Sequence, residues 1–140
     1  MDLLDTFRIS GAGLVAERVR LQAVASNLAN ARTTRTAEGG PYQRRSPVFE
    51  AAPLGVFGDR LERELSTVEV SEVRVAQSPG RRVFEPGHPD ADPDGYVTYP
   101  DIDVMQEMVD MMTSSRAYEA NLNVLETTRN LALRALDLGR

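Results

Sequence analysis

The chain has 140 residues, a formal net charge of −5 and no cysteine, and its length fits one domain or one small domain with helical extensions. An acidic chain has no excess of cations to neutralise phosphates, which excludes nucleic acid as the main partner, and the absence of cysteine excludes disulfides, thiol catalysis and zinc–cysteine sites. No apolar run approaches the length of a membrane span, and acidic residues occupy the place of the basic region of a signal peptide, so we expect neither membrane insertion nor a cleaved leader.

The N-terminal segment, residues 1–35, is predicted to form a helix over about 2–32. Apolar or small residues recur along it at alternating three- and four-residue spacing, which is typical of a helix that packs along one seam. Its two asparagines flank the seam, where they either fix register across subunits or, equally well, face solvent and cap the helix end. The expected interface residues are Phe7, Leu14, Leu21, Val24, Asn27, Leu28 and Asn30.

The middle segment, residues 36–100, is predicted to be β-rich and irregular, because it holds most of the prolines and shows no helical period. Residues 42–51 could form a strand, at a sheet edge because a proline interrupts them. Valines alternate along 68–75 and change phase midway, which predicts a strand with a bulge near Ser71 and Glu72.

Two further stretches of the middle segment carry weaker patterns. Residues 60–65 are ambiguous between helix and strand, and residues 79–94 read as a loop rich in proline, glycine and aspartate.

The C-terminal segment, residues 101–140, is predicted to form a long helix over 101–138, capped by Asp101 or Asp103 and ended by Gly139. One seam runs along it through Val104, Met108, Met111, Ser115, Tyr118, Leu122, Leu125, Ala132 and Leu136. A second stripe runs through Ala117, Val124, Thr128, Leu131, Ala135 and Leu138. The expected interface residues are Met108, Met111, Tyr118, Asn121, Leu122, Leu125, Leu131 and Leu136.

These elements predict a mainly α chain with a small β part, in which the long terminal helices pair as a coiled-coil-like bundle. Residues 1–35 carry five arginines against three acids, and residues 101–140 carry four arginines against seven acids, so the two helices attract each other. The N-terminal helix can cover one stripe of its partner but hardly both, which favours a partner outside the chain. A monomeric helical hairpin under a small β-flap fits the same pattern equally well.

An acidic motif in the middle segment matches part of a calcium loop. Asp90, Asp92, Asp94 and Asp101 stand where an EF-hand places ligands. The surrounding prolines prevent the entering helix that an EF-hand needs, so an acidic turn is the favoured interpretation. His88, the single histidine, has no second metal ligand of its kind, and no nucleophile–base pair is evident. We therefore expect no metal, no cofactor and no enzymatic activity.

Several motifs resemble a known family. Phe7–Leu14 (FRISGAGL), Ala25–Asn30 (ASNLAN) and Ser115–Asn121 (SRAYEAN) resemble the terminal signatures of flagellar rod and hook proteins. Pro86–Asp92 (PGHPDAD) and Glu107–Met111 (EMVDM) are similar to the proximal-rod members of the flagellar basal-body rod family.

This resemblance implies a structural subunit that polymerises through its terminal helices into the axial tube, which transmits torque and encloses the export channel. It implies export by the flagellar type III apparatus without a cleaved signal, and a place in the periplasmic rod of the basal body. The implied partners are further copies of the chain, the sibling rod proteins FlgB, FlgF and FlgG, FliE and the membrane ring. A calcium-binding module built on residues 90–101 and a helical adaptor with one fixed partner are the alternatives.

Overall fold

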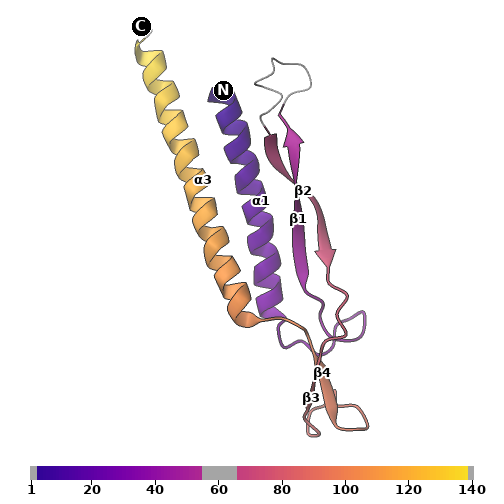
Figure 1. Ribbon diagram of the computed structural model, residues 1–140. Coiled ribbons are helices and arrows are strands. Elements are labelled where there is room, and N and C mark those ends of the chain that lie inside the picture. Colours follow the sequence, from indigo (N-terminus) through magenta and orange to yellow (C-terminus); the bar gives the residue numbers. More distant parts are fainter. Residues whose placement is uncertain (1–2, 55–65, 139–140) are drawn as a thin grey trace.

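The computed structural model describes residues 3–54 and 66–138 as an elongated molecule of two long helices and two small β-hairpins (Figure 1). The predicted fold class, mainly α with a small β part, is confirmed. The elements in chain order are α1 (Leu3–Ala29), β1 (Arg45–Pro53), β2 (Ser66–Val75), β3 (Arg81–Phe84), β4 (Tyr96–Tyr99) and α3 (Val104–Leu138).

Helix α1 lies at the centre of the upper part of the molecule, between α3 on one side and the β1–β2 hairpin on the other (Figure 1). The two helices run antiparallel, so that the N-terminal and C-terminal ends lie together, and the β3–β4 hairpin lies at the opposite end. Buried or half-buried residues of α3 follow the three–four spacing of a coiled-coil seam. They are Glu107, Met111, Ser114, Tyr118, Asn121, Leu125, Thr128 and Ala132, and the half-buried Asp110, Ser115 and Ala117 lie beside this seam.

Helix α3 begins at Val104 because Asp103 caps it. The Asp103 Oδ1 atom accepts hydrogen bonds from the backbone amides of Met105, at 2.9 Å, and Gln106, at 3.3 Å, which satisfies two of the free amides of the first turn. This confirms the predicted cap, and the helix starts three residues later than predicted. The predicted stop at Gly139 lies outside the described residues.

The β1–β2 hairpin contains the predicted bulge. Val48 is paired with Glu72 and Phe49 with Val70, which leaves Ser71 as the extra residue on β2. The prediction is confirmed because a two-residue side-chain period cannot change phase without an inserted residue. Residues 60–65, the ambiguous stretch, lie outside the described residues.

The prediction of a loop over residues 79–94 is wrong at its start, because Arg81–Phe84 forms β3 and pairs antiparallel with β4. Packing between side chains on the two strands explains the hairpin. Phe84 and Tyr96 make an edge-to-face contact with ring centroids 5.3 Å apart, and the Arg82 guanidinium lies 4.7 Å from the centre of the Tyr96 ring. Strands this short carry too little alternation to be recognised in sequence.

Candidate assembly interface

The contact between α1 and α3 is held at one end by a buried polar cluster. The Glu107 side chain on α3 is 1% exposed and accepts a hydrogen bond from Arg44 Nε at 2.6 Å and another from Asn27 Nδ2 at 3.0 Å. Arg44 is partly exposed, and its Nη2 atom also lies 3.9 Å from Asp110 Oδ2. The buried carboxylate therefore has a charged partner and a neutral donor, as a buried charge requires.

Asn27 is the centre of this polar cluster and is fully buried. Besides Glu107, its Nδ2 donates to the backbone oxygen of Arg45 at 2.8 Å. Its Oδ1 accepts from the backbone amide of Arg45 at 2.8 Å and from the Tyr42 hydroxyl at 3.1 Å. Both donors and both acceptor positions of the amide are used, so one side chain joins α1, the first residue of β1 and α3.

Farther along the helices, a glycine of α1 leaves space for an asparagine side chain of α3. A Cβ atom placed on Gly13 would lie 2.9 Å from Asn121 Nδ2 and 3.2 Å from its Cγ. The same construction at Gly11 meets nothing within 4 Å. The buried positions of α3 in this contact are polar, namely Glu107, Ser114 and Thr128, with Met111, Tyr118 and Leu125 half-buried beside them. Other large apolar side chains of α3 are left outside the contact.

The face of α3 turned away from α1 exposes a run of large apolar side chains near its start, which we call the methionine patch. Met105 is 70% exposed and Met112 is 57% exposed. The patch consists of Val104, Met105, Met108, Val109 and Met112. Toward the C-terminal end of α3, further apolar side chains are exposed, namely Leu122, Val124, Leu131, Leu133 and Leu136. A helix with this much exposed apolar surface is typical of a protein that associates with another.

The chain is similar in sequence to known proteins along its whole length. The sequence profile of the family described as "Flagellar basal body rod FlgEFG protein C-terminal" matches residues 94–138, which contain β4 and α3. The flagellar basal-body rod protein FlgC of Escherichia coli O6:H1 is 42% identical over 142 residues, with 100% of each chain covered. Proteins of the same name from Bacillus subtilis and Borreliella burgdorferi are 34% and 33% identical, with 100% and 97% of each chain covered.

The chain belongs to the FlgC family of flagellar basal-body rod proteins. This confirms the resemblance seen in the terminal and middle motifs. As a FlgC-family member the chain is a structural subunit of the flagellar proximal rod. Membership of this family implies a structural rather than a catalytic role. In the described residues of this FlgC relative, neither helix is long and apolar enough to cross a membrane.

The interface residues predicted from sequence differ in burial and fall into three groups. Val24 and Asn27 are buried. Met108, Leu122, Leu131 and Leu136 are exposed, between 41% and 71%. The half-buried ones are Phe7, Leu14, Leu21, Leu28, Asn30, Met111, Tyr118, Asn121 and Leu125.

Two of the predicted asparagines bond inside the chain. Asn27 does so as described above, and Asn30 Nδ2 donates to the backbone oxygen of Ser26 at 2.9 Å in the last turn of α1. The set of interface residues expected from sequence did not include Met105, Val109 and Met112. The four-residue repeats in the methionine patch could have revealed them.

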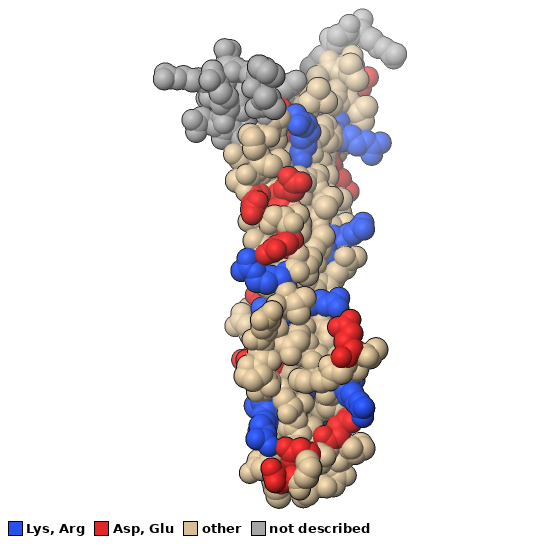
Figure 2. Space-filling model, turned by 90° about the vertical axis from the view of Figure 1, so that its right-hand side faces the viewer, with Lys and Arg blue, Asp and Glu red and all other residues tan. Residues whose placement is uncertain are grey.

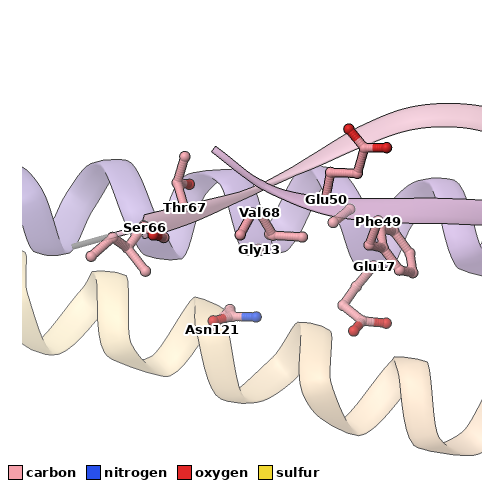
Figure 3. Close-up of a pocket in the computed structure, with 11 residues that line it drawn as sticks. Gly13, Glu17, Phe49, Glu50, Ser66, Thr67, Val68 and Asn121 are labelled. Carbon is pink, nitrogen blue, oxygen red and sulfur yellow. The ribbon is translucent and has the colours of Figure 1, made fainter. Parts of the chain in front are cut away.

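A hollow of about 550 Å³ opens between α1, the β1–β2 hairpin and Asn121 of α3 (Figure 3). Glu17 points into the space toward α3 in this view. The Oε2 atom of Glu17 and the hydroxyl of Thr67, which both line the hollow, are shielded and make no hydrogen bond in the described part of the chain. The lining offers hydrogen-bond acceptors and apolar walls. Among its described residues, no hydroxyl is hydrogen-bonded to a carboxylate, which is the pairing that would suggest nucleophilic catalysis.

Three of the four aspartates of the calcium hypothesis have carboxylates with separate partners, and Asp94 contributes its backbone amide. Asp90 accepts from the Thr34 hydroxyl at 2.7 Å, and Asp101 from the Ser78 hydroxyl at 3.2 Å. Asp92 closes a turn within its own loop, in which the backbone amide of Asp94 donates to it. Among residues 3–54 and 66–138, no three carboxylate or histidine side chains gather in a way that could hold a metal ion. The structure gives the calcium hypothesis no support.

Asp92 Oδ1 instead accepts the backbone amide of Tyr96 at 2.8 Å, while Arg82 lies 2.6 Å from its Oδ2. The Tyr96 amide and then Arg82 lower the pKa of Asp92 below its usual 3.8. Because the folded-state pKa is the lower one, its contribution to the hairpin is complete above about pH 4 and is lost as the pH falls through the folded value.

We expect the Tyr96 amide resonance to shift with a midpoint below pH 3.8 in an NMR titration. The matched variant Asp92→Asn keeps an acceptor oxygen but cannot titrate, so it should abolish this step. A midpoint at or above 3.8 in the unchanged chain would contradict the assignment.

Proposed function

We propose that this rod subunit polymerises through the outward faces of α1 and α3, and that neighbouring subunits cover the apolar side chains that one copy leaves exposed. The observation that carries the proposal is the methionine patch. It faces away from α1, the helix that packs along α3, and fully burying one such side chain contributes about 1.5–3 kcal/mol. Several of them on one short face therefore favour association strongly.

The assembly that fits this chain is a helical tube. Two different faces meeting head to tail, with a rotation and a rise at every step, build an open helix instead of a closed pair. Within such a tube the subunit transmits torque and encloses the export channel, and it performs no catalysis. Its neighbours are further copies of itself, the sibling rod proteins FlgB, FlgF and FlgG, FliE at the base, and the membrane ring.

We also infer that the subunit occupies the periplasmic part of the rod. It reaches this place through the flagellar type III export apparatus, with no cleaved signal. The domain division that supports this function is an assembly helix over 1–35, a middle segment over 36–100 and a second assembly helix over 101–140. The charge pattern on the hairpin side agrees with a non-nucleic-acid partner, because basic and acidic side chains alternate along it (Figure 2).

Replacing Met105 and Met112 together by glutamate is expected to abolish rod assembly and motility. The double variant places two charges in a contact that should be apolar, while in the free chain both side chains are already exposed, so folding should change by less than about 0.5 kcal/mol per site. Motility and the content of this subunit in purified basal bodies provide the measurement, with circular dichroism of the purified chain as the folding check.

The matched control is Gln106→Glu, an exposed position on the same helix outside the methionine patch. It should leave motility unchanged. Normal basal bodies containing the double methionine variant would overturn the proposal that this patch is an assembly surface.

A further inference from the structure

The exposed side of α1 carries two arginines that take part in no ion pair within the described residues. Arg8 and Arg18 are both exposed and belong to a row at three–four spacing that faces away from α3 and from the β1–β2 hairpin. We call this row the α1 outer row, made of Leu4, Arg8, Gly11, Val15, Arg18, Gln22, Ala25 and Ala29. It contains no acidic residue.

Helix α3 carries the opposite charge on one of its outward faces. Glu119, Glu126 and Asp137 are exposed, and none of them forms an ion pair in the described part of the chain. They are seven and eleven residues apart, close to two and three whole helical turns, so they share one face. We call them the α3 acidic row. Arg116 and Arg134 lie on the neighbouring face, about 60° around the helix.

The spacings of the two rows match when the helices run antiparallel. Arg8 and Arg18 are separated by about 15 Å along α1, and Glu126 and Asp137 by about 16.5 Å along α3, at 1.5 Å per residue. One antiparallel alignment therefore places Arg18 beside Glu126 and Arg8 beside Asp137 at the same time. Copies that point the same way along a rod would meet in this antiparallel manner, because α1 and α3 are already antiparallel within each copy.

The same alignment offers a reason for Gly11, at which no contact among residues 3–54 and 66–138 requires the lack of a side chain. Gly11 then faces Leu133, which is 49% exposed. A helical glycine costs about 1 kcal/mol relative to alanine, and space for a leucine from a neighbour is a gain that offsets this cost.

We propose that the α1 outer row of one copy packs against the α3 acidic row of the next, with Arg18 opposite Glu126 and Arg8 opposite Asp137. The inference rests on the proposed polymerisation and specifies which faces meet and in what register. The contact is heterologous, since it uses a different face on each copy, so it can continue from copy to copy. The charges set register and orientation more than affinity.

Disulfide trapping tests this register cleanly, because the chain has no cysteine of its own. Arg18→Cys combined with Glu126→Cys, in the full chain assembled in basal bodies, should give a ladder of cross-linked multimers on oxidation. A bond within one copy is excluded by geometry. Arg20 lies beside Asp110 and Gly13 beside Asn121, so Arg18 is level with about residues 112–116, and Glu126 lies at least about 15 Å farther along α3. A disulfide requires Cα atoms within about 7 Å.

The matched control replaces Thr127 instead of Glu126, together with Arg18. Thr127 is exposed at nearly the same height on α3 but about 100° around the helix, so it should give about tenfold less multimer. Equal ladders from the two pairs, or no ladder from assembled Arg18→Cys/Glu126→Cys subunits, would overturn the register.

A charge exchange provides the second measurement if the cysteine pair does not assemble. Arg18→Glu should lower incorporation into basal bodies by about tenfold, and adding Glu126→Arg should restore it. Arg81→Glu, on the distant β3–β4 hairpin, controls for net charge and should leave incorporation unchanged. Failure of Glu126→Arg to restore incorporation would overturn the pairing, whereas absence of the unaltered chain from the rod would instead contradict the proposed function.

Discussion

Alanine in place of Asn27 is expected to lower the free energy of unfolding by about 3 kcal/mol or more, because each buried group left without its hydrogen bond costs about 1–3 kcal/mol. The variant removes four hydrogen bonds at once and leaves the Arg45 backbone groups, the Tyr42 hydroxyl and one oxygen of Glu107 without this partner. Urea unfolding followed by circular dichroism measures the change.

Two further variants separate the cause of this loss. Asn123→Ala makes the same chemical change at an exposed position of α3 and should stay within about 0.5 kcal/mol of the unaltered chain. Asn27→Asp keeps the shape of the side chain but cannot donate, and it sets a second carboxylate beside Glu107. At neutral pH, Asn27→Asp should lower the free energy of unfolding by at least as much as Asn27→Ala does. If Asn27→Asp left the free energy of unfolding unchanged, the hydrogen bonds of Asn27 would not be what holds the elements together.

The second large effect is expected at Gly13, where leucine should lower the free energy of unfolding by about 2–3 kcal/mol. Even the Cβ atom would lie 2.9 Å from Asn121 Nδ2 and 3.2 Å from its Cγ, so leucine must displace the Asn121 side chain and overpack the space between the two helices. The overpacking cost exceeds the gain of about 1 kcal/mol that a better helix former brings. Thermal unfolding of the purified chain measures the difference.

Gly11 provides the matched comparison in the same helix. Gly11→Ala should stabilise the free chain by up to about 1 kcal/mol, because its Cβ meets nothing within 4 Å. A loss of stability at Gly13 and a gain at Gly11, only two residues apart, would show that the space filled by the Asn121 side chain, and not helix propensity, decides the effect at Gly13. A destabilised Gly11→Ala variant would contradict this account.

The long elements of the fold could be predicted from sequence because their signals are strong and local. The periodic apolar residues predicted both helices, the aspartates before α3 predicted its cap, and the phase change in the valines predicted the bulge at Ser71. The β3–β4 hairpin was missed because its four-residue strands depend on contacts between residues as far apart as Phe84 and Tyr96.

The face that α3 turns toward α1 could not be predicted from its apolar residues. The apolar positions predicted a seam through Met108 and Leu122, yet both are exposed, while Glu107 and Ser114 are fully buried. Burial of Glu107 depends on Arg44 and Asn27, which are distant in sequence, and local periodicity contains no information about such partners. Hydrophobic pattern shows how much surface must be covered, but polar pairing decides which side is covered within one copy.

The N-terminal end of α1 and the C-terminal end of α3 lie together at one end of the molecule, opposite the β3–β4 hairpin (Figure 1). This placement has a mechanical consequence. A pull between the hairpin end and the helix ends acts along the helix axes. The two helices then carry the tension side by side, and no component of this force separates them across their interface. Peeling, in which contacts break one after another, would require the two helix ends to be drawn sideways apart, and flanking subunits in a wall would block that movement.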